Sequence, residues 1–202
     1  MKTKIVKRTQ FFALLCAVTT LMFLSCEKEN LEPISEPDAA GKLSYKLEEA
    51  ANPTADQKDA YKKIKAAMDA AIKEYNKHSN FNKKITVKYV PSVSTANSVT
   101  GGALIKFGKN RTYMCKATAM HEISHSIGVG GSRWQKLVDN KKKIYTGENG
   151  KKKYKELKGQ NAVLKADKKH FWKFGLNKPS DKDYKKHVQM VVAIKKDIDN
   201  VK

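Results

Sequence analysis

Two histidines four residues apart are the feature of this sequence that most restricts its fold. They belong to His121-Glu122-Ile123-Ser124-His125, an HExxH motif. On an α-helix, side chains at positions i and i+4 lie on the same face, so both imidazoles can bind one metal ion. Met120 and Ile127 extend an apolar stripe on another face of the same segment. We therefore expect a core-packed helix from Lys116 that ends at Gly128, since glycine is a common helix C-cap.

The residue types in this motif predict a zinc site. Histidine pairs on one helix face are typical ligands of Zn²⁺, and Glu122 lies next to the position that such a pair leaves open. Zinc polarises a peptide carbonyl and makes a bound water more acidic, and a carboxylate can accept the proton. The motif thus predicts a hydrolase with His121 and His125 as metal ligands and Glu122 as the catalytic base.

A third ligand must come from elsewhere in the chain, because a catalytic zinc has three protein ligands and one water. His170 stands beside two aromatic residues and is our first choice. His187, on an expected C-terminal helix, and Asp167 remain alternatives, although a lone inward histidine is also a common core residue. Glu148 and His78 are weaker candidates.

The N-terminal residues resemble a bacterial lipoprotein signal. A basic start is followed by an apolar run from Phe11 to Leu24, shorter than the ~20 residues that span a bilayer. The stretch Phe23-Leu24-Ser25-Cys26 resembles a lipobox, in which the cysteine is lipidated. We expect a signal peptide (1–25), a lipid anchor at Cys26, a tether (26–53) and one catalytic domain (54–202). The protein would be exported and anchored to the bacterial outer membrane or cell surface.

The charge of the chain predicts anionic partners. The formal net charge is +21, of which the signal contributes four, leaving +17 in the rest. Almost all the cations are lysines, whereas base-specific readout relies on arginine, so we expect no nucleic-acid partner. Anionic glycans or surfaces are expected to be attracted. With Cys16 removed and Cys26 lipidated, Cys115 remains unpaired and is expected to be a small buried residue.

Periodicity predicts an α+β domain with a small sheet. Thr54 to Gln57 has the pattern of a capping box, followed by a long amphipathic helix up to about Tyr75. Short strands are expected at 85–89, 103–107 and 111–115, with a polar loop at 92–100. Residues 103–107 would form an edge along which an extended peptide pairs. A last helix is expected to start near Pro179, in a mostly helical C-terminal part.

Downstream motifs follow one another in a specific order. After Gly130 come Trp134, Tyr145-Thr146-Gly147, the block His170 to Asn177 (HFWKFGLN), and a closing helix with His187 and Asp197. This order is similar to that of a zincin-like metallopeptidase family of secreted bacterial and fungal proteins, which carry HExxHxxGVG, a Trp, a Thr-Gly turn and HFWxxGLN. The resemblance covers about Tyr113 to Ile198. It implies a zincin-like fold and supports the HFWxxGLN block as part of the site. The metzincin signature is not met, because Gly131 stands where its third histidine would be.

Three aromatic residues have open roles. Trp134 and Trp172 are expected in the core and, as the alternative, along a substrate cleft. Tyr145 is a weak candidate for stabilising an oxyanion. Together the motif and the resemblance predict a zinc-dependent peptidase that acts on extracellular or surface proteins. The alternatives are a non-catalytic surface protein that binds anionic glycan or host protein and holds a structural zinc, and an amidase or deacetylase with the same zinc chemistry.

Overall fold

The computed structural model describes residues 42–202, which belong to one compact unit. The expected signal peptide (1–25), Cys26 and the first part of the tether lie outside the described residues. Within 42–202, helices alternate with short strands in two sheets, which confirms the α+β class.

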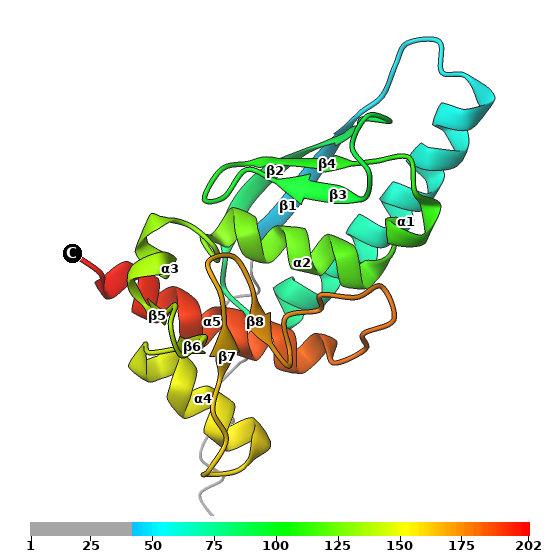
Figure 1. Ribbon diagram of the computed structural model, residues 1–202. Helices are drawn as coiled ribbons and strands as arrows, with labels where there is room; N and C mark the ends of the chain where they lie inside the picture. Colours follow the sequence, from blue (N-terminus) through cyan, green and yellow to red (C-terminus); the bar gives the residue numbers. More distant parts are fainter. Residues whose placement is uncertain (1–41) are drawn as a thin grey trace, which may run out of the picture. The chain divides into compact units, whose positions relative to one another are not determined.

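The first layer is a four-stranded sheet in the order β1-β2-β4-β3 (Figure 1). The strands β1, β2 and β4 are parallel, and β3 pairs antiparallel with β4 at one edge. Parallel strands need a long crossover connection, which helix α1 provides between β1 and β2. The bounds are β1 Lys42–Glu48, β2 Asn82–Tyr89, β3 Ala96–Ser98 and β4 Leu104–Phe107.

The first strand corrects the predicted tether. Residues 42–48 were assigned to the tether (26–53), yet they form β1 and pair with β2 along its whole length. Leu43 is buried in the core, and Tyr45 and Leu47, on the same face, pack against it. This alternation is a strand signal, but the surrounding prolines and acids favoured a tether. The folded domain therefore begins before residue 54.

The opposite edge of the sheet also differs from the prediction. A strand at 103–107 is confirmed as β4, but it lies between β2 and β3 and is not an edge. The edge is β3, inside the segment expected to be a loop. Residues 111–115 form no strand: Arg111–Tyr113 is a 3₁₀ helix, η1. The side chain of Asn110 accepts a hydrogen bond from the Thr112 amide and turns the chain toward the next helix.

Two helices cover one face of this sheet side by side, α1 (Ala55–His78) and α2 (Lys116–Ile127) (Figure 1). The predicted capping box at the start of α1 is confirmed, since Thr54 and Gln57 cap each other reciprocally. The predicted end of α2 is also confirmed. Gly128 has a φ of 123°, and its amide donates to the carbonyls of Ser124 and His125.

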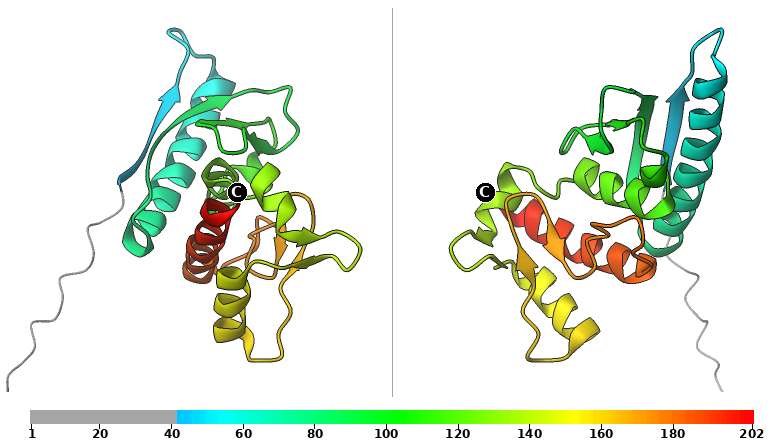
Figure 2. Two further views of the ribbon diagram at one scale, coloured as in Figure 1. Left: turned by 90° about the vertical axis from the view of Figure 1, so that its left-hand side faces the viewer. Right: turned by 45° about the vertical axis from the view of Figure 1, so that its right-hand side comes forward.

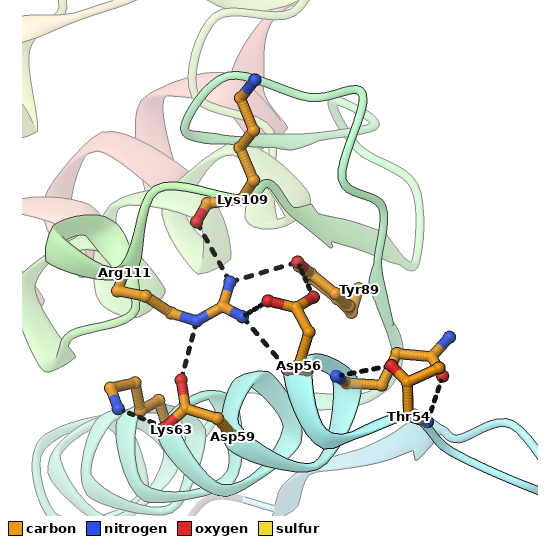
Figure 3. A network of polar contacts seen from close by, with 8 residues as sticks. Thr54, Asp56, Asp59, Lys63, Tyr89, Lys109 and Arg111 are labelled. Atoms are coloured by element: carbon orange, nitrogen blue, oxygen red, sulfur yellow. Dashed lines mark hydrogen bonds and ion pairs between the residues drawn. The ribbon is translucent and has the colours of Figure 1, made fainter.

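Arg111 fastens α1 to the sheet (Figure 3). Its guanidinium donates to Asp56 Oδ1 (2.5 Å), to Asp59 Oδ2 (2.8 Å) and to the hydroxyl of Tyr89 on β2 (3.1 Å). It also donates to the carbonyl of Lys109. A lysine has one donor centre and cannot reproduce this forked geometry, which explains an arginine in a lysine-rich chain.

The C-terminal half contains a second sheet that sequence periodicity did not predict. Its four strands have two residues each and pair antiparallel in the order β5-β6-β7-β8. Figure 2 shows helix α5 between the layer of α1 and α2 and this small sheet with α4. The expectation of a mostly helical part is thus only partly correct. The bounds are α3 Ser132–Lys136, β5 Val138–Asp139, β6 Ile144–Tyr145, α4 Glu148–Lys158, β7 Lys165–Ala166, β8 Phe171–Trp172 and α5 Tyr184–Asn200.

Asp197 of α5 caps the N-terminus of α4. Its carboxylate accepts from the amides of Asn149 (2.9 Å) and Gly150 (2.8 Å), and from the hydroxyl of Tyr145 (3.2 Å). A Cβ at residue 147 would lie 2.5 Å from Asp197 Oδ2, so only glycine leaves room for this approach. These contacts join the Thr-Gly turn, the start of α4 and Asp197 into one structural unit.

Substituting Asp197 by alanine is expected to lower the free energy of unfolding by about 3 kcal/mol, because the cap is lost and buried donors stay unpaired. Urea denaturation followed by circular dichroism measures this change. The matched control is Asp199→Ala, since Asp199 is exposed on the same helix. Equal stability of Asp197→Ala and Asp199→Ala would contradict the capping role.

Candidate metal centre

Helix α2 presents the HExxH motif to a cavity while most of its other residues are buried. Met120 and Ile123 are fully buried in the core, as the predicted apolar stripe requires. His121, Glu122 and His125 line a cavity of about 320 Å³. The helix thus holds all three side chains on a rigid support at one wall of the cavity.

The structure brings three histidines together at this wall. One ring nitrogen each from His121, His125 and His170 lies within 4.8 Å of the others. The Nε2 atoms of His121 and His125 are 3.1 Å apart. Two nitrogens on a tetrahedral zinc are separated by about 3.3 Å, so this pair is nearly at binding geometry. A metal bound here would be held by two adjacent turns of α2 and by the segment between β7 and β8.

The outward ring nitrogens of His121 and His125 face backbone carbonyl oxygens. The Nδ1 atom of His121 lies 2.8 Å from the carbonyl oxygen of Gly175, and that of His125 lies 2.9 Å from the carbonyl oxygen of Val129. The Nδ1 atom of His170 lies 3.6 Å from Asp167 Oδ1. A carbonyl can only accept, so His121 and His125 donate from Nδ1 and turn an unprotonated Nε2 toward the cavity. This tautomer is the one that binds metal.

The position of His170 depends on the residues on both sides of it. Asp167 Oδ1 accepts from the backbone amides of Lys169 and His170, both at 2.7 Å, which folds the tip between β7 and β8. Gly130, at a φ of +84°, lets this tip approach, since a Cβ there would lie 3.1 Å from the carbonyl oxygen of Lys169. Gly130, the residue before the position where a metzincin carries its third histidine, therefore leaves space for the tip that carries His170.

The other ligand candidates lie elsewhere. His187 is fully buried and lies outside the histidine cluster. Its Nδ1 lies 2.8 Å from the carbonyl oxygen of Phe174, and its Nε2 lies 2.9 Å from the hydroxyl of Tyr75 and 3.2 Å from the carbonyl oxygen of Met120. Burial lowers the pKa of His187 to about 4, so it stays neutral. His187 is therefore a core residue, which was the alternative expectation for a lone histidine that points inward.

The remaining candidates have structural partners. Asp167 positions His170 but is not part of the cluster. His78 lies 3.3 Å from Glu74 on α1, and Glu148 lies 2.7 Å from Lys151 on the exposed face of α4. Among residues 42–202, only the three histidines form a group with metal-binding geometry.

Burial controls the protonation of the motif. Burial, followed by the nearby charge of His125, lowers the pKa of His121 to about 3. The pKa of His125 is also lowered, mainly by burial. Burial raises the pKa of Glu122 to about 7. Neutral imidazoles at neutral pH match the state that a metal requires of its ligands.

The cavity has walls that sequence analysis did not assign to it. The edge strand β3 forms one wall, and Tyr113 of η1 and Asn177 of the HFWKFGLN block form others. A three-residue polar strand such as β3 carries no periodic signal. Asn177 was within the motif block, but its place at the cavity was not predicted.

Two of the aromatic candidates are core residues and the third is exposed. Trp134 and Tyr145 are fully buried and stack at 4.9 Å, and neither lines the cavity. Tyr145 therefore does not reach an oxyanion in this cavity. Trp172 is 39% exposed, and its ring centroid lies 6.1 Å from that of His170. Trp172 thus lies outside the core beside His170, and it does not line the cavity.

No family model, curated protein or solved structure matches this chain. Across residues 42–202, no helix combines the length and the apolar character needed to cross a membrane.

Proposed function

We propose that this protein is a zinc-dependent peptidase, with His121, His125 and His170 as metal ligands. The observation that carries the proposal is the convergence of three imidazoles, two of which turn their outward nitrogens to carbonyl oxygens, with Glu122 in the same cavity. When bound, Zn²⁺ would polarise a substrate carbonyl and acidify water.

The protein's own groups would then position the substrate and move the proton. Glu122 is 6% exposed and reaches solvent only through the cavity, so its carboxylate is placed to accept a proton from water there. The same carboxyl would donate that proton to the leaving amine. The carbonyls of Gly175 and Val129 keep His121 and His125 in the binding tautomer throughout.

The edge strand supports a polypeptide substrate. The outer side of β3 has no strand partner in the described part of the chain. Ala96, Asn97 and Ser98 of this strand also line the cavity with the histidines. An extended peptide paired with β3 would therefore pass over the metal ligands, as in β-augmentation. This role belongs to β3 and not to residues 103–107, where sequence analysis placed it.

The geometry favours an enzyme over a binding protein with a structural zinc. A structural zinc site is closed by four protein ligands, whereas the group in residues 42–202 has three members. The carboxylate of Asp167, 3.6 Å from His170 Nδ1, is already engaged by two backbone amides. The exported, lipid-anchored location remains a prediction from residues 1–26, outside the described part.

Incubating the full-length protein with an unbiased peptide library tests the activity. We expect cleavage at neutral pH that stops after zinc chelation and returns on adding Zn²⁺. Mass spectrometry of the products identifies the cleaved bonds. Cleavage that persists in the metal-free protein would exclude a zinc peptidase, and a zinc-loaded protein that cleaves no peptide would favour an amidase or a binding protein.

A further inference from the structure

A second and larger cavity lies beside the candidate metal centre. Its volume is about 760 Å³, and the ends of α2 and α5, the start of α3 and the first residues of β2 line it. Thr100 lines both cavities, and the amide of Gly101 donates to the carbonyl of His125. The loop after β3 thus forms the boundary between the two spaces.

The second cavity carries an excess of positive charge. Lys83, Arg133, Lys195 and Lys196 line it, against one carboxylate, that of Asp199, which pairs with Lys195. In the described part of the chain, Arg133 and Lys196 have no hydrogen bond or ion pair through their side chains. Burial and then the charge of Lys195 lower the pKa of Lys83, whose ammonium donates to the carbonyls of Gly101 and Ser126.

Apolar side chains lie between these cations. Phe81, Ile127, Val192 and Ile198 form this part of the lining. A ligand that fits needs carboxylates for the cations and aliphatic segments for the apolar side chains, and a glutamate-containing polypeptide provides both. A sulfated or uronic glycan offers the charge but buries little apolar area.

The path of β3 connects the two cavities. The strand runs from Ala96 to Ser98 along the metal centre, and the chain continues through Val99 to Thr100 at the second cavity. An extended peptide advances about 3.3 Å per residue, so a few residues beyond the end of β3 suffice to reach it.

We propose that the second cavity binds an acidic stretch of the polypeptide substrate, on the side of the metal centre where β3 ends. The substrate class is therefore polypeptide with acidic residues a few positions from the cleaved bond. The placement of the peptide on β3 rests on the proposed function. Charge complementarity at Arg133 and Lys196 carries the selectivity.

The test measures binding separately from cleavage. Fluorescence anisotropy follows a labelled peptide with a Glu-rich half, and its Gln-substituted counterpart, on the full chain carrying Glu122→Gln. We expect the acidic peptide to bind more tightly, and the added pair Arg133→Gln and Lys196→Gln to weaken it about five- to tenfold. The pair Lys58→Gln and Lys62→Gln removes the same charge from the exposed face of α1 and should leave binding unchanged.

Any of three results would overturn the inference. The first is equal binding of both peptides, and the second is an equal loss of affinity for the acidic peptide in the two double variants. The third is binding of dextran sulfate that depends on Arg133 and Lys196, without binding of the acidic peptide. Cleavage by the wild-type chain is scored independently. Selective binding of the acidic peptide without cleavage of either peptide would refute the peptidase and keep the cavity assignment. Cleavage of both peptides at equal rates, with equal binding, would keep the peptidase and refute the cavity assignment.

Discussion

Changing Glu122 to glutamine should leave zinc bound and reduce peptide cleavage roughly 10²–10⁴-fold, the range lost with a general base. The amide has the size of the carboxyl but cannot accept the proton from water. Glu122 is not among the clustered imidazoles, so the metal ligands stay intact. Burial disfavours the charged carboxylate, so the neutral amide should not destabilise the fold.

The measurement is kcat for one cleaved library peptide. The zinc content of each protein is measured by elemental mass spectrometry. Glu148→Gln is the matched control, because it makes the same chemical change at an exposed position of α4. Wild-type cleavage by Glu122→Gln would remove it from the mechanism. Loss of zinc from this variant would show instead that the carboxylate holds the metal.

Changing His170 to alanine should weaken zinc binding by more than about a hundredfold, since loss of an outer-shell partner alone costs 10- to 100-fold. His170 stacks near His121, with ring centroids 5.3 Å apart, and completes the three-nitrogen group. Asp167→Asn should have a smaller effect, about tenfold, because Asp167 positions His170 without joining the cluster.

Competition with a zinc-binding dye gives these affinities, and circular dichroism confirms folding. The control is His78→Ala, which removes a histidine at the end of α1 that contacts Glu74 and no residue of the cluster. This variant should bind zinc with full affinity. Full affinity in His170→Ala would exclude His170 as the third ligand.

Local chemistry made the two long motif-bearing elements predictable. The capping pair Thr54 and Gln57 indicates the start of α1, and Gly128 indicates the end of α2. The spacing of His121 and His125 then places them on one face of α2. These features act within a few residues, so the sequence alone displays them.

Long-range contacts made the rest unpredictable. Residues 42–48 form the strand β1 because they pair in parallel with β2, from which they are separated in sequence by the whole of α1. The two-residue strands of the second sheet are too short to show alternation. Nothing local in Gly175 indicates that its carbonyl faces His121, 54 residues away in sequence. Asp197 likewise reveals its capping role only when α5 lies against α4.

Zinc K-edge X-ray absorption of the zinc-loaded wild-type protein tests the central claim most directly. A catalytic centre built on His121, His125 and His170 predicts stoichiometric zinc with three imidazole nitrogens and one oxygen from water. A shell of four protein ligands, or the absence of stoichiometric zinc, would contradict the catalytic centre proposed for this protein.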